Sequence, residues 1–461
     1  EPVSASSAPL WTVLLAGLHL LPVDVVVAAK LAGVLLLWGT GTFTFLLARQ
    51  AGLSGGWALL ASLAAATTPR LIWGSLSGME ITLYAAAATA GTWLCLRSRG
   101  KPPGPGATVL LAAAALARPE CLLLFPVLLL DSWLRMPSRP RTRVLRDLAR
   151  PCLLFALLLA PFVAFNFATI GHPFPNTYYA KVGPYGLPGA LARLDVLQVL
   201  KCLSYYPLLQ LVETIEFGAS NNAVLTAGAL AGAFAARRRP AGPERLLLVL
   251  ILALPLVRGV VAPYKGATFQ HGRYVAHLVP LIAVLGTVGL RDSLLWLVRS
   301  GGVALPRESR ILRPAAFAWV AVALNALLMQ PGGVRQFGEN VRDIQQMHLP
   351  MARWIAREAP EDAVVAAHDI GALGYFSGRR IIDTAGLISP EVLAFLKPRQ
   401  AADEGVLQFL MVKRPEFVIV MPNWYPRLVE SSYLLPVHSV SLESRSISAG
   451  DLLVAYRTEW P

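Results

Sequence analysis

One polar segment of the sequence combines the side chains most suited to binding a hydroxyl-rich, charged ligand. It runs from Gly171 to Lys181 and contains two prolines that stiffen its backbone. Its aromatic rings could stack on a sugar, its imidazole and amide could form hydrogen bonds, and its ammonium could bind a phosphate. An interfacial aromatic belt with an anchoring lysine is the alternative interpretation. The candidate residues are His172, Asn176, Tyr178, Tyr179 and Lys181.

A second polar segment runs from Gln270 to Tyr274, where a long apolar run begins. A guanidinium and an imidazole at the entrance to a membrane would suit an anionic lipid headgroup. Ordinary snorkelling of the arginine towards the membrane surface is the alternative. The candidates of this segment are His271, Arg273 and Tyr274.

Two carboxylates beside apolar runs, Glu80 and Glu120, are also candidates, because an ionisable residue near a membrane interior is a functional hypothesis by default. Glu80 could face a cavity, or it could complete a helix capping box with Ser77. Glu120 follows Arg118-Pro119, and Arg118 and Glu120 could simply neutralise each other in a turn. Both pairs of interpretations stay open on the sequence alone.

The remaining motifs are weaker. The stretch from Ala367 to Phe376 runs from a predicted strand into a loop with Asp369, at the position where α/β sites form, although a structural turn is the alternative. The sequence contains no P-loop, GxSxG or HExxH motif. Its cysteines lie in or beside apolar runs without CxxC spacing, which predicts neither a disulfide framework nor a zinc site. They are Cys95, Cys121, Cys152 and Cys202.

The elements that position these residues follow from composition. Of the 461 residues, 55% are hydrophobic and 15% are charged. Soluble chains carry about 25% charged residues, so an ordinary cytosolic enzyme is excluded, and the apolar content excludes intrinsic disorder. The net charge of +14 comes from basic residues clustered in linkers that are predicted to lie on the same side of the membrane. We interpret that clustering as the positive-inside rule of membrane topology, not as a nucleic-acid surface.

Ten apolar runs are predicted to cross the membrane as helices. Pro119 should divide two short ones, because the arginine-rich linker that follows would otherwise fall on the outer side. Two further segments, Leu10–Leu21 and Leu191–Glu216, are expected to lie at the membrane surface. The predicted spans are Val25–Ala48, Trp57–Gly74, Met79–Leu96, Ala107–Ala117, Cys121–Leu130, Cys152–Ile170, Ala223–Ala236, Leu246–Ala262, Tyr274–Leu290 and Pro314–Met329.

The sequence predicts two domains, a transmembrane domain over 1–330 and an extracytoplasmic α/β domain over 331–461. In the second, Met351–Glu358 is expected to be a helix, and Pro390–Leu396 and Glu404–Val412 have helical periodicity. The predicted strands are Ala363–Ala367, Arg380–Asp383, Phe417–Met421, Val437–Leu442 and Leu452–Tyr456. The fold class is therefore a polytopic α-helical membrane protein with a C-terminal α/β domain on the outer face.

Several motifs together resemble the GT-C class of membrane glycosyltransferases. Within that class the chain looks most like the bacterial family that contains the mycobacterial terminal arabinofuranosyltransferases. The motifs occur in order along nearly the whole chain, although each alone would be weak. They are Ala8–Trp11, Ser77–Glu80, Leu116–Glu120, Pro175–Lys181, His271–Tyr274, Asp369–Gly371 and Tyr375–Arg379.

The resemblance implies transfer of a pentose or hexose, with inversion, from a polyprenyl-phosphate donor to a cell-envelope glycan or lipid acceptor. The reaction would take place on the outer face of a bacterial inner membrane, with no cofactor required, although some relatives need a divalent metal. Lys181 and Arg273 would bind the phosphate, while His172, Asn176 and Tyr178 would bind the sugar. Other substrate-binding candidates are Tyr179, His271, Tyr274 and Arg118, with Glu80 and Glu120 as secondary carboxylates.

Members of that family begin with one more span, followed by an outer loop that carries the expected catalytic base. We therefore expect an eleventh span and the main base upstream of Glu1. A lipid-linked-sugar transporter or flippase is the alternative function. Such a protein should show an internal repeat with interrupted helices in matching halves, and the sequence shows no such repeat. No nucleic-acid partner is expected.

Overall fold

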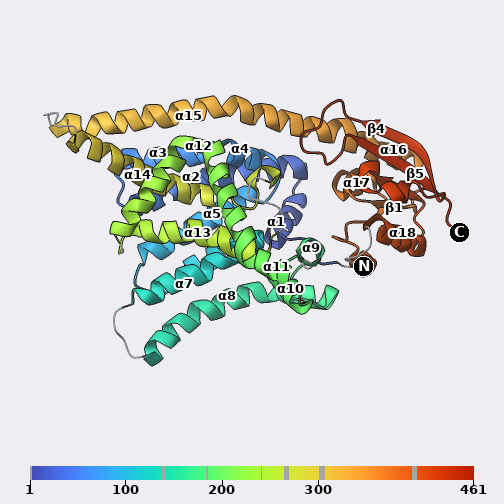
Figure 1. The fold of residues 1–461 in the computed structure, drawn as a ribbon, viewed down its shortest axis with the longest axis horizontal. Coiled ribbons are helices and arrows are strands. Elements are labelled where there is room, and N and C mark those ends of the chain that lie inside the picture. The colour runs from blue at the N-terminus through green and yellow to red at the C-terminus, as the bar shows by residue number, and fades with distance from the viewer. Residues whose placement is uncertain are drawn as a thin grey trace. The chain divides into compact units, whose positions relative to one another are not determined.

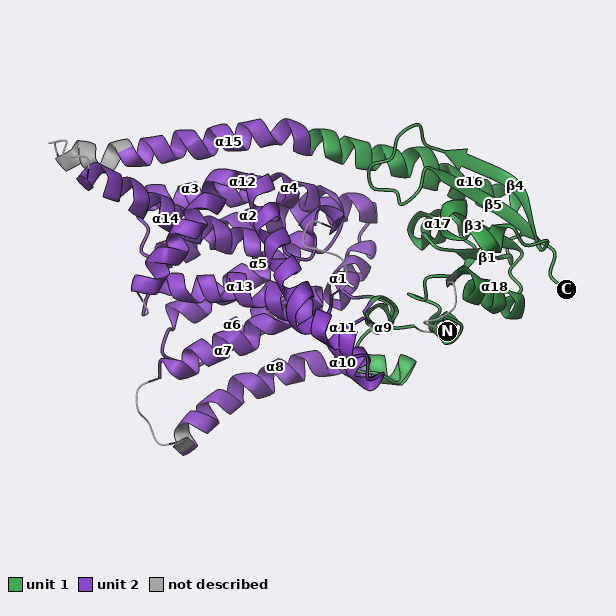
Figure 2. Ribbon diagram, in the orientation of Figure 1, with its two compact units in different colours: residues 1–6, 165–181, 334–461 green, residues 7–164, 182–333 purple. Residues whose placement is uncertain are grey.

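The computed structural model describes residues 3–136, 141–182, 185–239, 241–263, 269–300, 307–396 and 402–461, and is mostly helical there. The chain divides into two compact units (Figure 2). We call residues 7–164 and 182–333 the helical unit, and residues 1–6, 165–181 and 334–461 the α/β unit.

The helical unit is built from apolar helices joined by short turns (Figure 1). Two of its short elements, η1 (Pro119–Leu123) and η3 (Phe269–Gly272), are 3₁₀ turns, and η2 (Lys201–Tyr205) is a π-helical turn. Helices α8 and α15 each continue into the other unit. The α-helices are α1 (Pro9–His19), α2 (Val25–Gln50), α3 (Gly55–Ala66), α4 (Pro69–Leu76), α5 (Ile81–Arg97), α6 (Pro105–Ala117), α7 (Leu124–Leu134), α8 (Arg141–Ile170), α10 (Leu187–Ala192), α11 (Val196–Leu200), α12 (Tyr206–Arg238), α13 (Pro243–Val261), α14 (Leu278–Ser300) and α15 (Arg307–Asp343).

Four helical stretches are long and apolar enough to cross a membrane. They are Val25–Gln50, Val144–Ile170, Leu278–Ser300 and Pro314–Glu358. Each overlaps a predicted span. The other six predicted spans also fall on helices, and their crossing of a membrane stays a prediction.

Proline residues divide the helices where the chain must turn. The predicted break at Pro119 is confirmed, because α6 ends at Ala117 and Arg118 is extended at φ −154° and ψ 126°. The predicted span Trp57–Gly74 is not one continuous helix, since it forms α3 and α4 with a break before Pro69. Proline disfavours helical backbone in the preceding residue, which explains both breaks.

The predicted amphipathic segment Leu191–Glu216 is not a separate element. It comprises the end of α10, all of α11 and η2, and the start of α12, which runs on as far as Arg238. Only Asn222 interrupts α12, with φ −155° and ψ 95°. Its side-chain oxygen accepts the Leu225 N–H at 3.0 Å, as in a helix cap. The predicted surface segment and the predicted span Ala223–Ala236 therefore share one kinked helix.

Helices α12 and α14 meet through small residues. A Cβ atom placed on Gly228 would overlap the backbone of Gly286, and one on Gly286 would overlap the backbone of Leu225. Such contacts between helix backbones are typical of membrane proteins. They fix α14, whose first residues follow the polar segment 270–274.

The α/β unit contains a five-stranded sheet in the order β2-β1-β3-β5-β4. Strands β2, β1 and β3 are parallel to one another. Strand β5 runs antiparallel to both of its neighbours, β3 and β4. The alternation of side chains along the strands gives a core on each face, one including Val365 and Ile419 and the other Ala366 and Val418. The strands are β1 (Val364–Ala367), β2 (Arg380–Asp383), β3 (Phe417–Val420), β4 (Leu434–Ser441) and β5 (Leu452–Thr458).

All five predicted strands are confirmed, with ends that differ by up to three residues. The expected loop after the first strand is wrong, because residues 370–377 form helix α17. The predicted helical segments are all present, although Pro390–Leu396 is a 3₁₀ turn. The remaining elements are α9 (Asn176–Lys181), η4 (Ile344–His348), α16 (Leu349–Glu358), α17 (Ile370–Ser377), η5 (Pro390–Ala394), α18 (Ala402–Lys413), η6 (Pro422–Trp424) and α19 (Pro426–Val429).

Candidate functional site

Arg118 joins two carboxylates inside the helical unit. Its Nη1 donates to Glu80 Oε1 at 2.9 Å, and its Nη2 donates to Glu120 Oε1 at 3.3 Å. The Arg118 side chain is 3% exposed, so these bonds replace nearly all of its hydration. A buried guanidinium needs such partners, because an unpaired buried charge is strongly unfavourable.

These contacts decide between the open interpretations of the two glutamates. The capping box is wrong: Ser77 Oγ donates to Gly74 O at 2.8 Å, and the Glu80 side chain caps no helix. The neutralisation of Glu120 by Arg118 is confirmed, but the same guanidinium also binds Glu80. The pair is therefore part of a larger ionic cluster.

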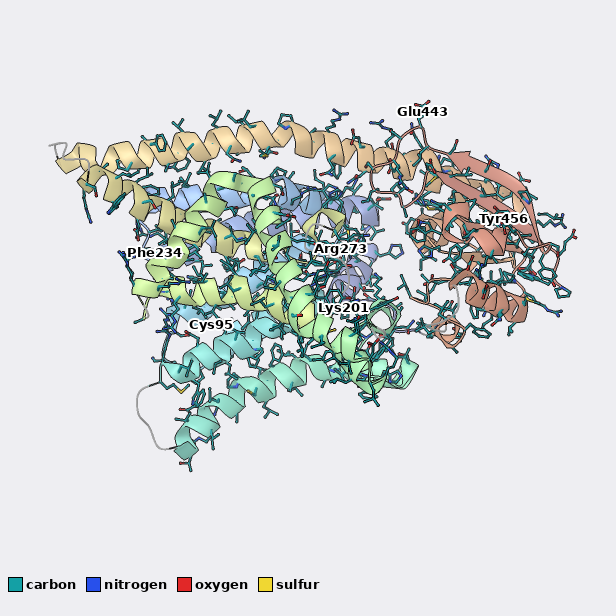
Figure 3. The ribbon with its side chains drawn as sticks, in the orientation of Figure 1. Cys95, Lys201, Phe234, Arg273, Glu443 and Tyr456 are labelled. Atoms are coloured by element: carbon teal, nitrogen blue, oxygen red, sulfur yellow. The ribbon has the colours of Figure 1, made fainter. Side chains whose placement is uncertain are left out.

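Arg273 extends this cluster from a distant part of the sequence. Its Nη2 donates to Glu80 Oε1 at 3.3 Å, and its Nη1 donates to Gln270 Oε1 at 2.9 Å. Its side chain is 20% exposed, whereas that of Arg118 is 3% exposed. Figure 3 labels Arg273 among the helices of this unit.

The ring of Tyr274 lies against three guanidiniums. The guanidinium carbons of Arg258, Arg118 and Arg273 lie 4.7, 4.8 and 5.8 Å from its centroid. Cation–π attraction favours this arrangement, most strongly where water is excluded. Arg258 also donates a hydrogen bond to Gln210 Oε1. Three arginines therefore gather around this ring, and the carboxylates of Glu80, Glu120 and Glu213 lie near them.

The backbone before Tyr274 is strained. Gln270, His271 and Gly272 have φ values of 45°, 60° and 74° in succession. The left-handed region is unfavourable for side-chain-bearing residues, so surrounding contacts must maintain it. One such contact is the Tyr84 hydroxyl, which donates to the Arg273 carbonyl.

His271 makes two contacts of its own in the helical unit. Its Nδ1 accepts a hydrogen bond from Arg70 Nη1 at 2.6 Å, and its ring lies 4.7 Å from that of Trp73. The segment that contains His271, Arg273 and Tyr274 therefore contacts α4 through His271 and α5 through the Arg273 carbonyl.

Sequence reasoning missed four residues of this region, Arg258, Gln210, Arg70 and His277. His277 is 3% exposed, and neither of its ring nitrogens has a hydrogen-bond partner in the described part of the chain. Arg258 could have been found, because it is a basic residue within the apolar run Leu246–Ala262. Arg70 and His277 carry the same signal, because they are ionisable residues within the predicted spans Trp57–Gly74 and Tyr274–Leu290, whereas Gln210 carries none.

The segment from Gly171 to Lys181 belongs to the α/β unit. There Asn176 begins α9, and its side-chain amide donates to Gly386 O and, at 3.2 Å, to Leu387 O. Its backbone N–H donates to Ser4 O at 2.8 Å. The amide therefore joins α9 to the turn after β2. Asn166, at the start of this part of the unit, accepts a hydrogen bond from Ser4 and donates to Pro173 O at 2.7 Å.

Four rings of the same segment contact one another. His172 lies 4.8 Å from Tyr179, Phe174 lies 4.9 Å from Tyr178, and the two tyrosine rings lie 5.3 Å apart. Burial raises the pKa of both tyrosine hydroxyls, and for Tyr178 the neighbouring Tyr179 raises its pKa further. Both phenols are therefore neutral at physiological pH. Lys181 follows in the last turn of α9 and is partly buried.

The predicted residues thus form two groups, one in each unit. Six lie in the helical unit, where the ionic cluster contains Glu80, Arg118, Glu120, Arg273 and Tyr274, with His271 in the adjoining turn. The described residues include no group of three or more His, Cys, Asp or Glu side chains that could hold a metal ion. The four cysteines are free thiols.

Comparisons with known proteins address the fold. A family model described as a domain of unknown function (DUF8728) matches residues 339–457. The comparison with curated proteins gave no match.

Solved structures match over nearly the whole chain. The Archaeoglobus fulgidus oligosaccharyltransferase complex with Zn and sulfate has a TM-score of 0.57 and 14% identity, and the match covers 93% of this chain and 63% of that one. Archaeal oligosaccharyltransferase AglB from Archaeoglobus fulgidus, in complex with an inhibitory peptide and a dolichol-phosphate, has a TM-score of 0.52 and 13% identity. That match covers 86% of this chain and 58% of the AglB chain. ArnT from Cupriavidus metallidurans has a TM-score of 0.51 and 12% identity, with 99% and 93% covered.

This chain therefore spans less than two thirds of the length of the archaeal chains and nearly all of ArnT. At these identities the likeness is one of fold. It supports the fold of the GT-C class for this chain, and with the apolar helices it indicates an integral membrane protein.

Proposed function

We propose that the chain is a GT-C glycosyltransferase that moves a pentose or hexose from a polyprenyl-phosphate donor to a cell-envelope glycan or lipid acceptor. The shared fold supports this proposal, as does the AglB structure, which by its description holds a dolichol-phosphate. The arginine-rich cluster of the helical unit supports it independently. We place the reaction on the outer face of a bacterial inner membrane, in keeping with the basic residues of the opposite linkers.

The observation that carries the proposal is the unequal pairing of the arginines. Arg118 is committed to two carboxylates, whereas Arg273 reaches one carboxylate at 3.3 Å and is partly exposed. A partly exposed guanidinium beside other arginines is well suited to donate two hydrogen bonds to phosphate oxygens. Arg273 is therefore our main candidate for binding the donor phosphate.

The reaction would break the bond between the anomeric carbon and the phosphate oxygen. Negative charge then develops on the leaving phosphate, where a fixed guanidinium stabilises it more than in the ground state. The acceptor hydroxyl would attack from the opposite face, which inverts the configuration, while a base removes its proton. Glu80 and Glu120 are bound to Arg118, so we assign them to holding the cluster.

The segment from 171 to 181 contains our other candidates for substrate binding. Lys181 is a candidate for binding a phosphate, and the rings of His172, Tyr178 and Tyr179 are candidates for contacting a sugar. Because the Asn176 amide already binds two carbonyls, we assign Asn176 to holding this segment in place. The proposed reaction does not require a divalent metal, although one could bind the phosphate.

The first test is transfer from a panel of polyprenyl-phosphate sugars to a set of glycan acceptors, read by mass spectrometry. The chain would be reconstituted in membranes. We expect transfer from one donor, and we expect Arg273→Ala and Lys181→Ala each to abolish it while folding and insertion remain. Arg335→Ala is the control, because Arg335 is 82% exposed on α15.

Unchanged transfer in both variants would overturn the phosphate assignment. Donor that is bound and moved across the bilayer without transfer would instead favour a lipid-linked-sugar transporter.

A further inference from the structure

Polar and aromatic side chains gather at one edge of the sheet in the α/β unit. His368 and Asp369 follow β1, Thr384 follows β2, and Trp424 and Tyr425 follow β3. The three strands are parallel, so these residues lie beyond their carboxyl ends. In the order β2-β1-β3, the chain leaves β1 for β2 on one side and then continues to β3 on the other side of β1. Ligands bind to open α/β sheets at such a point.

Among the residues that the structure describes, the imidazole of His368 is held through one nitrogen. Its Nδ1 shares a hydrogen bond with the Tyr425 hydroxyl at 2.6 Å, and that hydroxyl lies 3.2 Å from Thr384 Oγ1. This chain of contacts fixes the ring and leaves Nε2 for another partner. Burial lowers the pKa of His368 despite the nearby Asp369 and Asp383, so the ring is neutral at physiological pH.

Asp369 stands at the start of α17 without capping it. An aspartate in that position normally accepts N–H groups of the first turn, as Asp24 does from Val26 and Val27 at the start of α2. The Asp369 carboxylate accepts none, and no hydrogen bond to it is found within the described residues. By contrast, Asp383 accepts three backbone N–H groups. Asp369 is therefore the carboxylate available to a ligand.

An indole completes the set. Trp424 is 41% exposed, and its ring lies 4.3 Å from that of His368 at an interplanar angle of 78°. A large aromatic ring left in contact with solvent beside hydrogen-bonding groups is unusual, because its burial would be favourable. Its exposed surface lies next to the imidazole, where a ligand could contact both.

The chemistry of these groups selects among ligand classes. The carboxylates of Asp369 and Asp383 repel an anion, and the one available carboxylate, that of Asp369, provides with one imidazole too few ligands for a structural metal site. Hydroxyl groups, in contrast, can donate to a carboxylate and exchange hydrogen bonds with imidazole, while the C–H face of a sugar ring packs on indole. The combination fits a neutral carbohydrate.

We propose that His368, Asp369 and Trp424 form a binding site for a neutral glycan on the α/β unit, and that this glycan is the acceptor. The site itself stands on the geometry of the sheet edge, whereas its assignment to the acceptor rests on the proposed transferase function.

The test measures glycan binding directly, without any donor. The full chain, reconstituted in nanodiscs, would be titrated with neutral oligosaccharides of pentoses and hexoses. We expect Trp424→Ala and Asp369→Asn to weaken binding at least about tenfold, equivalent to about 1.4 kcal/mol. Trp424→Phe should retain much of the affinity. Asp362→Asn is the matched control, because Asp362 is exposed and precedes the other end of β1.

Absence of binding to every oligosaccharide, or equal affinity in Trp424→Ala, Asp369→Asn and wild type, would overturn the site. Equal affinity for a neutral glycan and its phosphorylated form would also contradict it.

The acceptor assignment has a separate readout. If transfer occurs, both variants should raise the acceptor KM about tenfold or more with little change in kcat. An unchanged KM would overturn this assignment and leave the transferase intact. Binding that depends on Trp424 and Asp369 in a chain without transfer would overturn the transferase and leave the glycan site intact.

Discussion

The two groups of candidate residues solve different physical problems. In the helical unit, Glu80, Arg118 and Arg273 come from three separate parts of the sequence and satisfy one another's charges. In the segment from 171 to 181, the rings contact their own neighbours in sequence, while Asn176 binds residues far along the chain. One group is held by long-range ion pairs and the other by local stacking.

This difference reflects the cost of burial. A charge in an apolar interior is stable only when partners replace its hydration, so the fold must bring those partners together. Aromatic rings and neutral amides can be satisfied close to their own position in the sequence. The ionic cluster should therefore be sensitive to single substitutions and the aromatic segment tolerant of them.

The largest effect is expected from Arg118→Met. It leaves the buried carboxylates of Glu80 and Glu120 without their shared partner, and breaking a buried pair in this way costs about 3–5 kcal/mol. The measurement is the unfolding midpoint of the purified chain in detergent. Adding Glu80→Gln and Glu120→Gln to Arg118→Met should restore part of the loss. An unchanged midpoint in Arg118→Met would show that the cluster does not stabilise the helical unit.

A smaller loss should follow from Gly272→Ala, which tests the strained turn before Arg273 and Tyr274. The added Cβ would sit at φ 74° and overlap the ring of Phe217. Backbone strain of this kind costs about 1–3 kcal/mol, and displacement of Arg273 should lower transfer. Gly338→Ala is the control, because a Cβ there meets open space within helix α15. Equal transfer in both variants would show that the conformation of this turn does not affect the transfer reaction.

Asn176→Ala probes a long-range contact of the other group. It removes the amide bonds to Gly386 and Leu387, whose loss should cost about 1–3 kcal/mol locally. Hydrogen exchange of the amides in residues 384–388 should accelerate, while exchange in α5 and α13 should not. Thr177→Ala, one residue later, is the control. Unchanged exchange in Asn176→Ala would mean that stacking alone holds the segment.

The smallest effect concerns alkaline pH. Because the folded-state pKa values of Tyr178 and Tyr179 are raised, the unfolded segment loses its protons first, near the usual value of about 10. Order in the segment should therefore be lost as pH rises through this value, whereas arginines stay charged. Limited proteolysis at increasing pH measures this loss. The double substitution Tyr178→Phe with Tyr179→Phe should abolish the pH dependence, and its persistence there would exclude the phenols as its cause.

Sequence patterns determined the local features of this protein. Proline placed the break at Arg118, and ionisable residues beside apolar runs singled out Glu80 and Glu120. These signals depend on a few neighbouring residues, because backbone preferences and side-chain periodicity act over one or two turns. The helix over 370–377 was missed because it contains Gly371 and Gly374, and glycine is typical of loops.

Only the tertiary structure decided which of these residues meet. It joined Glu80 to both Arg118 and Arg273, added Arg258 around Tyr274, and assigned Asn176 to the turn after β2. No local pattern encodes such pairings, because the energy that selects them is that of desolvating charges and finding partners far along the chain.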